Sequence, residues 1–89
     1  MNRVRLEKEG LLAEKRRELI DLFSRARAFQ VDLHSASNPF VPVEKMRIDE
    51  VVAIAKDLRD LLVGTAEKPG IRRVAAEIKE LKEELGIDD

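Results

Sequence analysis

Cysteine, tryptophan and tyrosine are absent from this chain of 89 residues, and His34 is its only histidine. Without cysteine, the chain cannot form a disulfide framework, a thiolate nucleophile or a cysteine-ligated zinc site. A single histidine also excludes a metal site built on two histidines. Three phenylalanines leave little aromatic surface on which bases could stack. These absences favour a protein that acts by binding over an enzyme or a metalloprotein, and we expect no cofactor.

Long apolar runs are also missing. No segment approaches the roughly 20 apolar residues that a membrane-spanning helix requires, and the opening MNRVRLEKEG lacks the apolar part of a secretory signal. The net charge is −1, from 17 basic and 18 acidic residues, so no overall field attracts nucleic acid or an anionic membrane. The sequence therefore predicts a cytoplasmic protein that does not act at a membrane.

Aliphatic and charged residues dominate what the sequence does contain. Hydrophobic residues make up 44% of the chain and charged residues 39%, a mixture typical of solvated helix faces rather than of disorder. Apolar residues recur at spacings of three and four, which place them on one face of an α-helix. A domain of this size buries a thin core, so a partner chain is a common source of stability. The prediction is an all-α domain, either a three-helix bundle or an elongated helical hairpin with a long first helix.

The first helix is predicted from about residue 2 to about residue 35 by a long helical pattern. Its apolar face comprises Leu12, Leu19, Leu22, Phe23, Ala26, Phe29 and Leu33. His34 is interpreted as a polar residue near the C-terminal end, where the helix dipole favours a cation. Gly10 costs a helix about 1 kcal/mol relative to alanine, and the sequence leaves open whether the helix is continuous through it.

Residues 36–42 are predicted to form a corner after the first helix. Pro39 disfavours helical backbone at Asn38 and so ends any helix before it. We expect the apolar residues that follow to pack beneath the corner as part of the core, namely Phe40, Val41 and Val43. The alternative is a presented recognition motif, because Asn38-Pro39-Phe40 is similar to the tripeptide that EH-domain adaptors bind.

The second helix is predicted over about 43–64, and a loop follows at 65–69. Glu44 suits the positive end of the helix dipole at the predicted start, and Gly64 suits the end. The apolar face of this helix comprises Ile48, Val51, Val52, Ala55, Leu58, Leu61 and Leu62. One stripe of apolar residues is expected to face the first helix.

The third helix is predicted over about 70–85. Its apolar face comprises Ile71, Val74, Ala75, Ile78, Leu81 and Leu85. Gly86 suits the left-handed position that closes a Schellman motif, in which Ile87 folds back onto Leu81. The sequence therefore predicts both the end of this helix and the way in which it is capped.

The unequal helix lengths carry the functional prediction. A first helix of about 34 residues spans roughly 50 Å, against roughly 30 Å and 24 Å for the other two. Shorter helices that fold back on it would leave its N-terminal third without an intramolecular partner, and an exposed apolar stripe often marks an interface. We predict a small helical protein–protein interaction module, an adaptor, regulator or assembly factor. It is expected to form a homodimer through Val4, Leu11, Leu12 and Leu19.

A nucleic-acid-binding accessory protein is the competing interpretation. It rests on basic residues of the first and third helices, namely Arg16, Arg17, Arg25, Arg27, Arg72 and Arg73. Such a function requires these side chains to gather on one surface, where phosphate contacts supply the affinity. An enzyme is not predicted, and the acidic C-terminal segment lacks the ligand spacing of a calcium loop. We expect neither a metal nor a small-molecule substrate.

Overall fold

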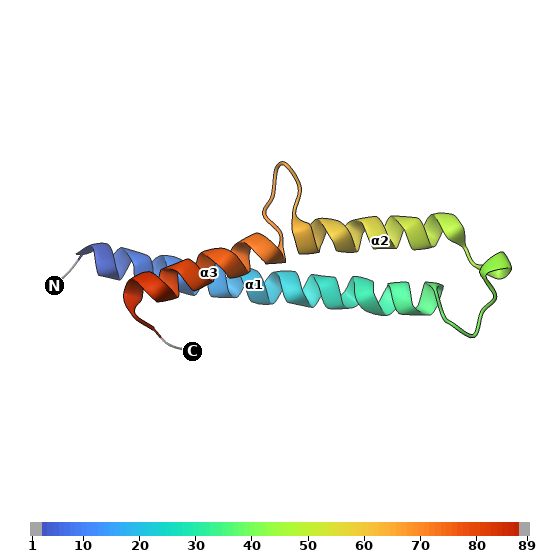
Figure 1. Ribbon diagram of the computed structural model, residues 1–89, viewed down its shortest axis with the longest axis horizontal. Helices are drawn as coiled ribbons and strands as arrows, with labels where there is room; N and C mark the ends of the chain where they lie inside the picture. Colours follow the sequence, from blue (N-terminus) through green and yellow to red (C-terminus); the bar gives the residue numbers. More distant parts are fainter. Residues whose placement is uncertain (1–2, 88–89) are drawn as a thin grey trace.

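Two shorter helices follow one another along a single long helix. The computed structural model describes residues 3–87. Its helices are α1 (Arg3–Ala36), α2 (Ile48–Val63) and α3 (Ile71–Leu85). α2 runs back along the C-terminal half of α1, and α3 continues in the same direction along the N-terminal half (Figure 1). With dimensions of 64 × 26 × 15 Å, the elongated form of the predicted all-α fold is confirmed.

α1 continues without a break through Gly10. A Cβ atom at Gly10 would meet no other atom within 4 Å, so the fold does not require glycine there. The residues on either side, EKE and LLAE, are strong helix formers and carry the helix across this position. The structure therefore answers the question that the sequence left open.

Alanine at Gly10 and alanine at Gly86 are expected to change stability in opposite directions. At both positions a Cβ atom would have open space around it. Gly10→Ala should raise the free energy of unfolding by about 1 kcal/mol, because alanine is the better helix former. Gly86 has a φ of 71°, so Gly86→Ala should lower the free energy of unfolding by about 1–2 kcal/mol. Urea titrations followed by circular dichroism measure both changes, and a destabilised Gly10→Ala variant would contradict a continuous α1.

The end of α3 is the Schellman motif that the sequence predicts. The N–H of Gly86 donates to the carbonyl of Glu83 at 3.2 Å, and the N–H of Ile87 donates to the carbonyl of Lys82 at 2.8 Å. Ile87 packs against the buried cluster that contains Leu81. Both parts of the prediction, the left-handed glycine and the returning isoleucine, are confirmed.

α2 begins later than predicted. Val43–Lys45 form only a short 3₁₀ turn, and Met46 then adopts extended backbone with φ −71° and ψ 141°. The helix itself begins at Ile48, with Asp49 and Glu50 in its first turn. Carboxylates in the first turn complement the positive end of the helix dipole, so this acidic pair is the stronger start signal.

The buried core lies mainly between α1 and α3. Its six side chains are Leu12, Leu22, Val74, Ile78, Leu81 and Leu85, and the partly buried residues packed against them are Leu19, Leu61, Ile71 and Ile87. Leu61 is therefore the contribution of α2 to this cluster. The C-terminal half of α1 and most of α2 form a hairpin beside the core.

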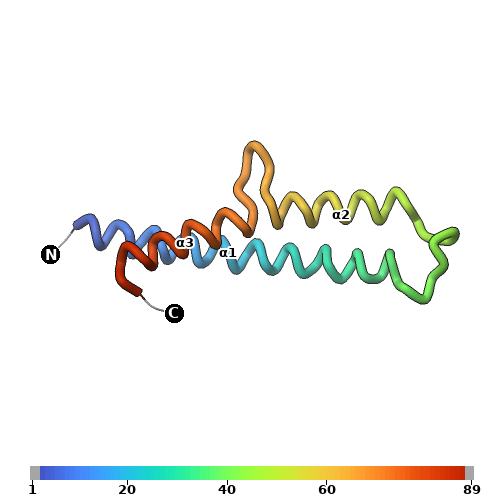
Figure 2. Tube along the Cα trace, viewed as in Figure 1, coloured from blue at the N-terminus to red at the C-terminus, as the bar shows by residue number. Residues whose placement is uncertain are grey.

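The expectation that the N-terminal third of α1 lacks an intramolecular partner is wrong. α3 follows α2 end to end rather than lying beside it (Figure 2), so it covers the start of α1. The ammonium group of Lys8 lies 3.1 Å from the carboxylate of Glu84, and that of Lys15 lies 2.7 Å from the carboxylate of Glu77. The hydrogen bond in the second pair lowers the pKa of Glu77 and raises the pKa of Lys15.

The loop between α2 and α3 has a narrow base made of two glycines. A Cβ atom at Gly70 would lie 2.7 Å from the carbonyl carbon of Val63 and 2.8 Å from the carbonyl oxygen of Leu61, and would also collide with the backbone nitrogen of Gly64. Gly64 itself has a φ of 91°. The sequence predicted a loop here, but not this contact between two backbone segments.

Thr65 holds the loop above this base. Its N–H donates to the carbonyl of Lys68 at 2.8 Å, and its hydroxyl accepts from the N–H of Lys68 at 3.1 Å and of Glu67 at 3.3 Å. The loop projects from the hairpin between the two helices (Figure 1). By closing tightly, it sets the start of α3 directly after the end of α2.

Candidate protein-interaction surface

α2 carries two rows of apolar residues rather than the single predicted stripe. The inner row faces α1 and is half-buried: Val51, Ile54, Leu58 and Leu61. The outer row remains exposed: Ile48, Val52, Ala55 and Leu62. None of the 16 residues of α2 is buried. The two rows were merged in the sequence-based prediction because both follow helical spacing.

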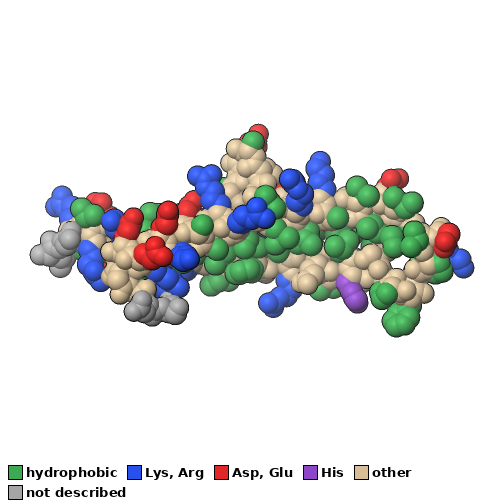
Figure 3. Space-filling view, in the orientation of Figure 1, with side chains coloured by type: hydrophobic (Ala, Val, Ile, Leu, Met, Phe, Trp, Pro, Cys, Tyr) green, Lys and Arg blue, Asp and Glu red, His purple; other side chains and the backbone are tan. Residues whose placement is uncertain are grey.

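A shallow groove joins the outer row to α1. It has a volume of about 280 Å³ and is lined by Phe23, Ala26, Arg27 and Gln30 of α1, by Leu58 and Leu62 of α2, and by Ile71 at the start of α3. Because Leu62 belongs to the outer row, this row and Phe23 lie on one face of the hairpin. We call Phe23, Ile48, Val52, Ala55 and Leu62 the apolar face. Figure 3 shows hydrophobic side chains gathered along the seam between α1 and α2.

The side chains of the apolar face are widely open to solvent. The exposed fractions are 63% for Ile48, 60% for Val52, 50% for Phe23 and 43% for Leu62. Isolated exposed aliphatic residues are common on soluble proteins, but a continuous apolar surface usually marks an interaction site. Among residues 3–87, no further helix covers these side chains.

The apolar residues of the corner do not pack into the core, so the prediction that they lie beneath the corner is wrong. Phe40 is 92% exposed, Val43 69% and Val41 40%. The turn is closed by its own hydrogen bonds, since the side-chain oxygen of Asn38 accepts from the N–H of Phe40 at 2.9 Å and its carbonyl accepts from the N–H of Val41 at 2.9 Å. This Asx turn needs no packing from the Phe40 ring.

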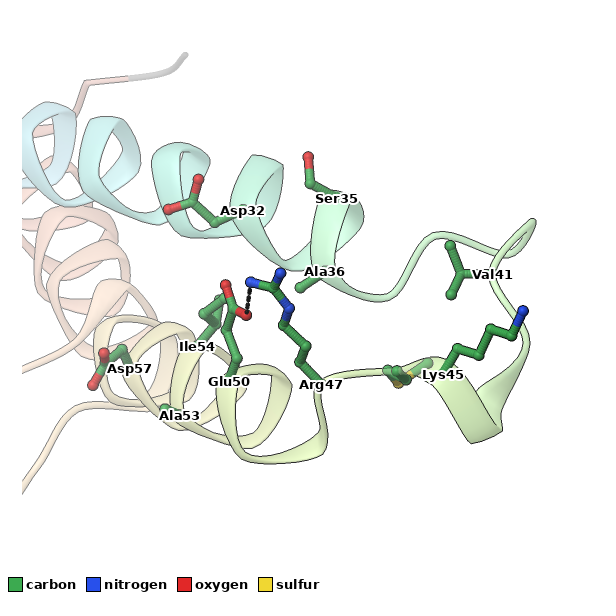
Figure 4. A pocket seen from close by; sticks show the side chains of 11 residues that line it. Asp32, Ser35, Ala36, Val41, Lys45, Arg47, Glu50, Ala53, Ile54 and Asp57 are labelled. Atoms are coloured by element: carbon green, nitrogen blue, oxygen red, sulfur yellow. Dashed lines mark hydrogen bonds and ion pairs between the residues drawn. The ribbon is translucent and has the colours of Figure 1, made fainter.

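A second, polar cleft opens on the other flank of the hairpin. Its volume is about 690 Å³, and its lining includes Asp32 and Ser35 of α1, and Glu50 and Asp57 of α2 (Figure 4). Arg47 lies 3.5 Å from the carboxylate of Glu50. These side chains are exposed. Within residues 3–87, no group of three or more histidine, aspartate or glutamate side chains is placed to hold a metal ion.

The four predicted interface residues on α1 are divided between core and surface. Leu12 is buried with an exposed fraction of 4%, and Leu19 packs against the core. Val4 and Leu11 are exposed at 57% and 42%. Leu12 and Leu19 therefore face the core, whereas the side chains of Val4 and Leu11 are exposed.

Two of the six arginines of the nucleic-acid interpretation are paired with carboxylates. Arg25 lies 3.1 Å from the carboxylate of Asp21, and Arg73 lies 3.0 Å from that of Glu77. Arg25 and Arg27 are two residues apart on α1 and so point about 200° away from each other around the helix. The remaining members are Arg16 and Arg17 on α1 and Arg72 on α3.

Comparison of the chain with protein-family models, with curated proteins and with solved structures yields no match. Among the helices of residues 3–87, none combines the length and the apolar character needed to cross a membrane.

Proposed function

We propose that this protein is a helical protein–protein interaction module, and that it forms a homodimer through the apolar face. The observation that carries the proposal is the state of α2, which has apolar residues on two sides and buries none of its 16 residues. The inner row packs against α1. The outer row requires a partner, because exposed apolar surface is stabilised by removal from water.

The partner of the apolar face is a second copy of the same chain. The hairpin is only 15 Å thick, about one layer of helices. Two such hairpins stacked face to face form a four-helix arrangement, the common way in which paired helices enclose a core. Dimerisation also supplies apolar burial that a chain of this size has difficulty providing alone.

Binding rather than catalysis is the proposed mode of action, and it needs no cofactor or small-molecule substrate. The charged groups of the polar cleft are exposed, whereas catalytic groups are usually tuned by burial and close partners. The nucleic-acid alternative is less well supported, because two of its arginines are paired with carboxylates.

The mass in solution tests the proposal. Light scattering on a size-exclusion column, over a tenfold range of concentration, should give twice the 10.1 kDa of one chain at the upper end. Dilution should move the average mass toward one chain if the interface is of ordinary strength. A mass of one chain throughout would refute the proposed homodimer.

A further inference from the structure

We infer that the two copies pair antiparallel through their α2 helices, with a two-fold axis that passes beside Ala55. This inference rests on the proposed dimer and adds its geometry. In a two-fold interface the same patch is used by both copies, so that patch must match itself when read in reverse. The two ends of the outer row of α2 have this property.

The two ends of the outer row are placed symmetrically about Ala55. Ile48 lies seven residues before Ala55 and Leu62 lies seven residues after it. Antiparallel pairing therefore sets Ile48 of each copy against Leu62 of the other. The small side chain of Ala55 lies at the centre, where two helices approach most closely.

In this antiparallel pair, the partner's Ile48 would occupy the groove between α1 and α2. Leu62 and Phe23 both line it, and the partner's Ile48 stands at the level of Leu62 in this alignment. Ile48 is 63% exposed and begins α2, so its side chain projects freely from the helix end. Insertion of this side chain into the groove buries apolar surface on both copies, twice by symmetry.

Two charged residues of α2, Arg59 within the outer row and Asp49 next to it, favour the same orientation. Asp49 lies six residues before Ala55 and Arg59 lies four residues after it. Antiparallel pairing brings Asp49 and the partner's Arg59 within about 3 Å along the helix axis. Arg59 is 70% exposed and has only its neighbour Asp60, at 3.9 Å, as an ion-pair partner among the described residues. Parallel pairing would instead set Arg59 against the partner's Arg59, which opposes association.

Cysteine crosslinking tests the geometry without interference, because the chain has no cysteine. A disulfide requires Cα atoms about 4.4–6.8 Å apart, a distance that helices in contact reach at a small central residue. Ala55→Cys should crosslink under mild oxidation at least about tenfold faster than Ala66→Cys, because the interface raises the effective concentration of the thiol. Ala66 is exposed on the projecting loop, so it measures the rate of random collision.

Two further variants separate the orientations. In the antiparallel pair, two copies of residue 48 lie about 21 Å apart along the axis, so Ile48→Cys alone should not crosslink. A mixture of Ile48→Cys and Leu62→Cys should. Self-crosslinking of Ile48→Cys, or a slow Ala55→Cys in a protein of dimeric mass, would overturn the antiparallel geometry while leaving the dimer intact. A monomeric mass would remove the dimer and this inference together.

Discussion

Replacement of Gly70 by alanine is expected to destabilise the protein by about 3 kcal/mol or more, the upper range for overpacking a filled site. A chain of this length has roughly 5–13 kcal/mol of stability in total. The single methyl group should therefore remove a large part of it.

The physical reason is the contact between two backbone segments at the base of the loop. The atoms that a Cβ at Gly70 would strike belong to the main chain of Leu61, Val63 and Gly64. Main-chain atoms at the end of α2 cannot rotate away as a side chain can, so the loop must open. Opening displaces Ile71 and the start of α3, which pack against the core.

Gly70 tests this contact more cleanly than Gly64 does. Its backbone has φ −98° and ψ −175°, a conformation that any residue adopts. The cost of Gly70→Ala is thus steric, whereas Gly64→Ala would also strain the backbone, because residue 64 has a φ of 91°. Urea titration followed by circular dichroism gives the free energy of unfolding, with Gly10→Ala as the matched control. A Gly70→Ala variant as stable as the unmodified protein would show that the base of the loop is not closed.

Features with local causes could be predicted from the sequence. The length of α1 follows from helical spacing and strong helix formers, and the end of α3 follows from one glycine with an isoleucine after it. Such signals act within a few residues, so no knowledge of the rest of the fold is needed. The all-α fold class follows from the same spacing.

Features that depend on packing between distant segments could not be predicted from the sequence. Helical spacing in α2 does not distinguish Val51, which faces α1, from Val52, which faces solvent, because which row is covered depends on how α1 lies. The position of α3 along the start of α1 depends on the glycine contact at the base of the loop. Phe40 was expected in the core because it is apolar, yet the turn at Asn38 is closed without it.

The sequence does contain a signal for the outer row of α2, but the sequence-based prediction did not separate this row from the inner row. Ile48, Val52, Ala55 and Leu62 follow spacings of four, three and seven, which place them on one side of α2, apart from the inner row. A helix with two such stripes has more apolar surface than one neighbour can cover. Two rows of apolar residues on a short helix therefore indicate two contacts.

Val52→Lys is expected to weaken dimerisation by about 100-fold or more, which corresponds to about 2.8 kcal/mol. Val52 lies within the outer row, and a lysine there would place an ammonium group in a closed interface, once in each copy, within about 1.5 Å along the helix axis of the partner's Arg59. Removing such a charge from water costs several kcal/mol when no partner compensates it. The fold itself should be unaffected, because Val52 is 60% exposed in the single chain.

Val31→Lys is the matched control. Val31 has the same side chain and an exposed fraction of 59%. It lies two residues before the half-buried Leu33 and so points about 200° away from it around α1, on the side turned away from α2. The added charge is therefore the same, while its distance from the apolar face differs.

The most direct test is the mass of these two variants by light scattering, at one concentration at which the unmodified protein is dimeric. A function carried by the outer row of α2 predicts a monomer for Val52→Lys and a dimer for Val31→Lys, with unchanged helix content in both. A dimeric Val52→Lys variant, or two variants of equal mass, would contradict it.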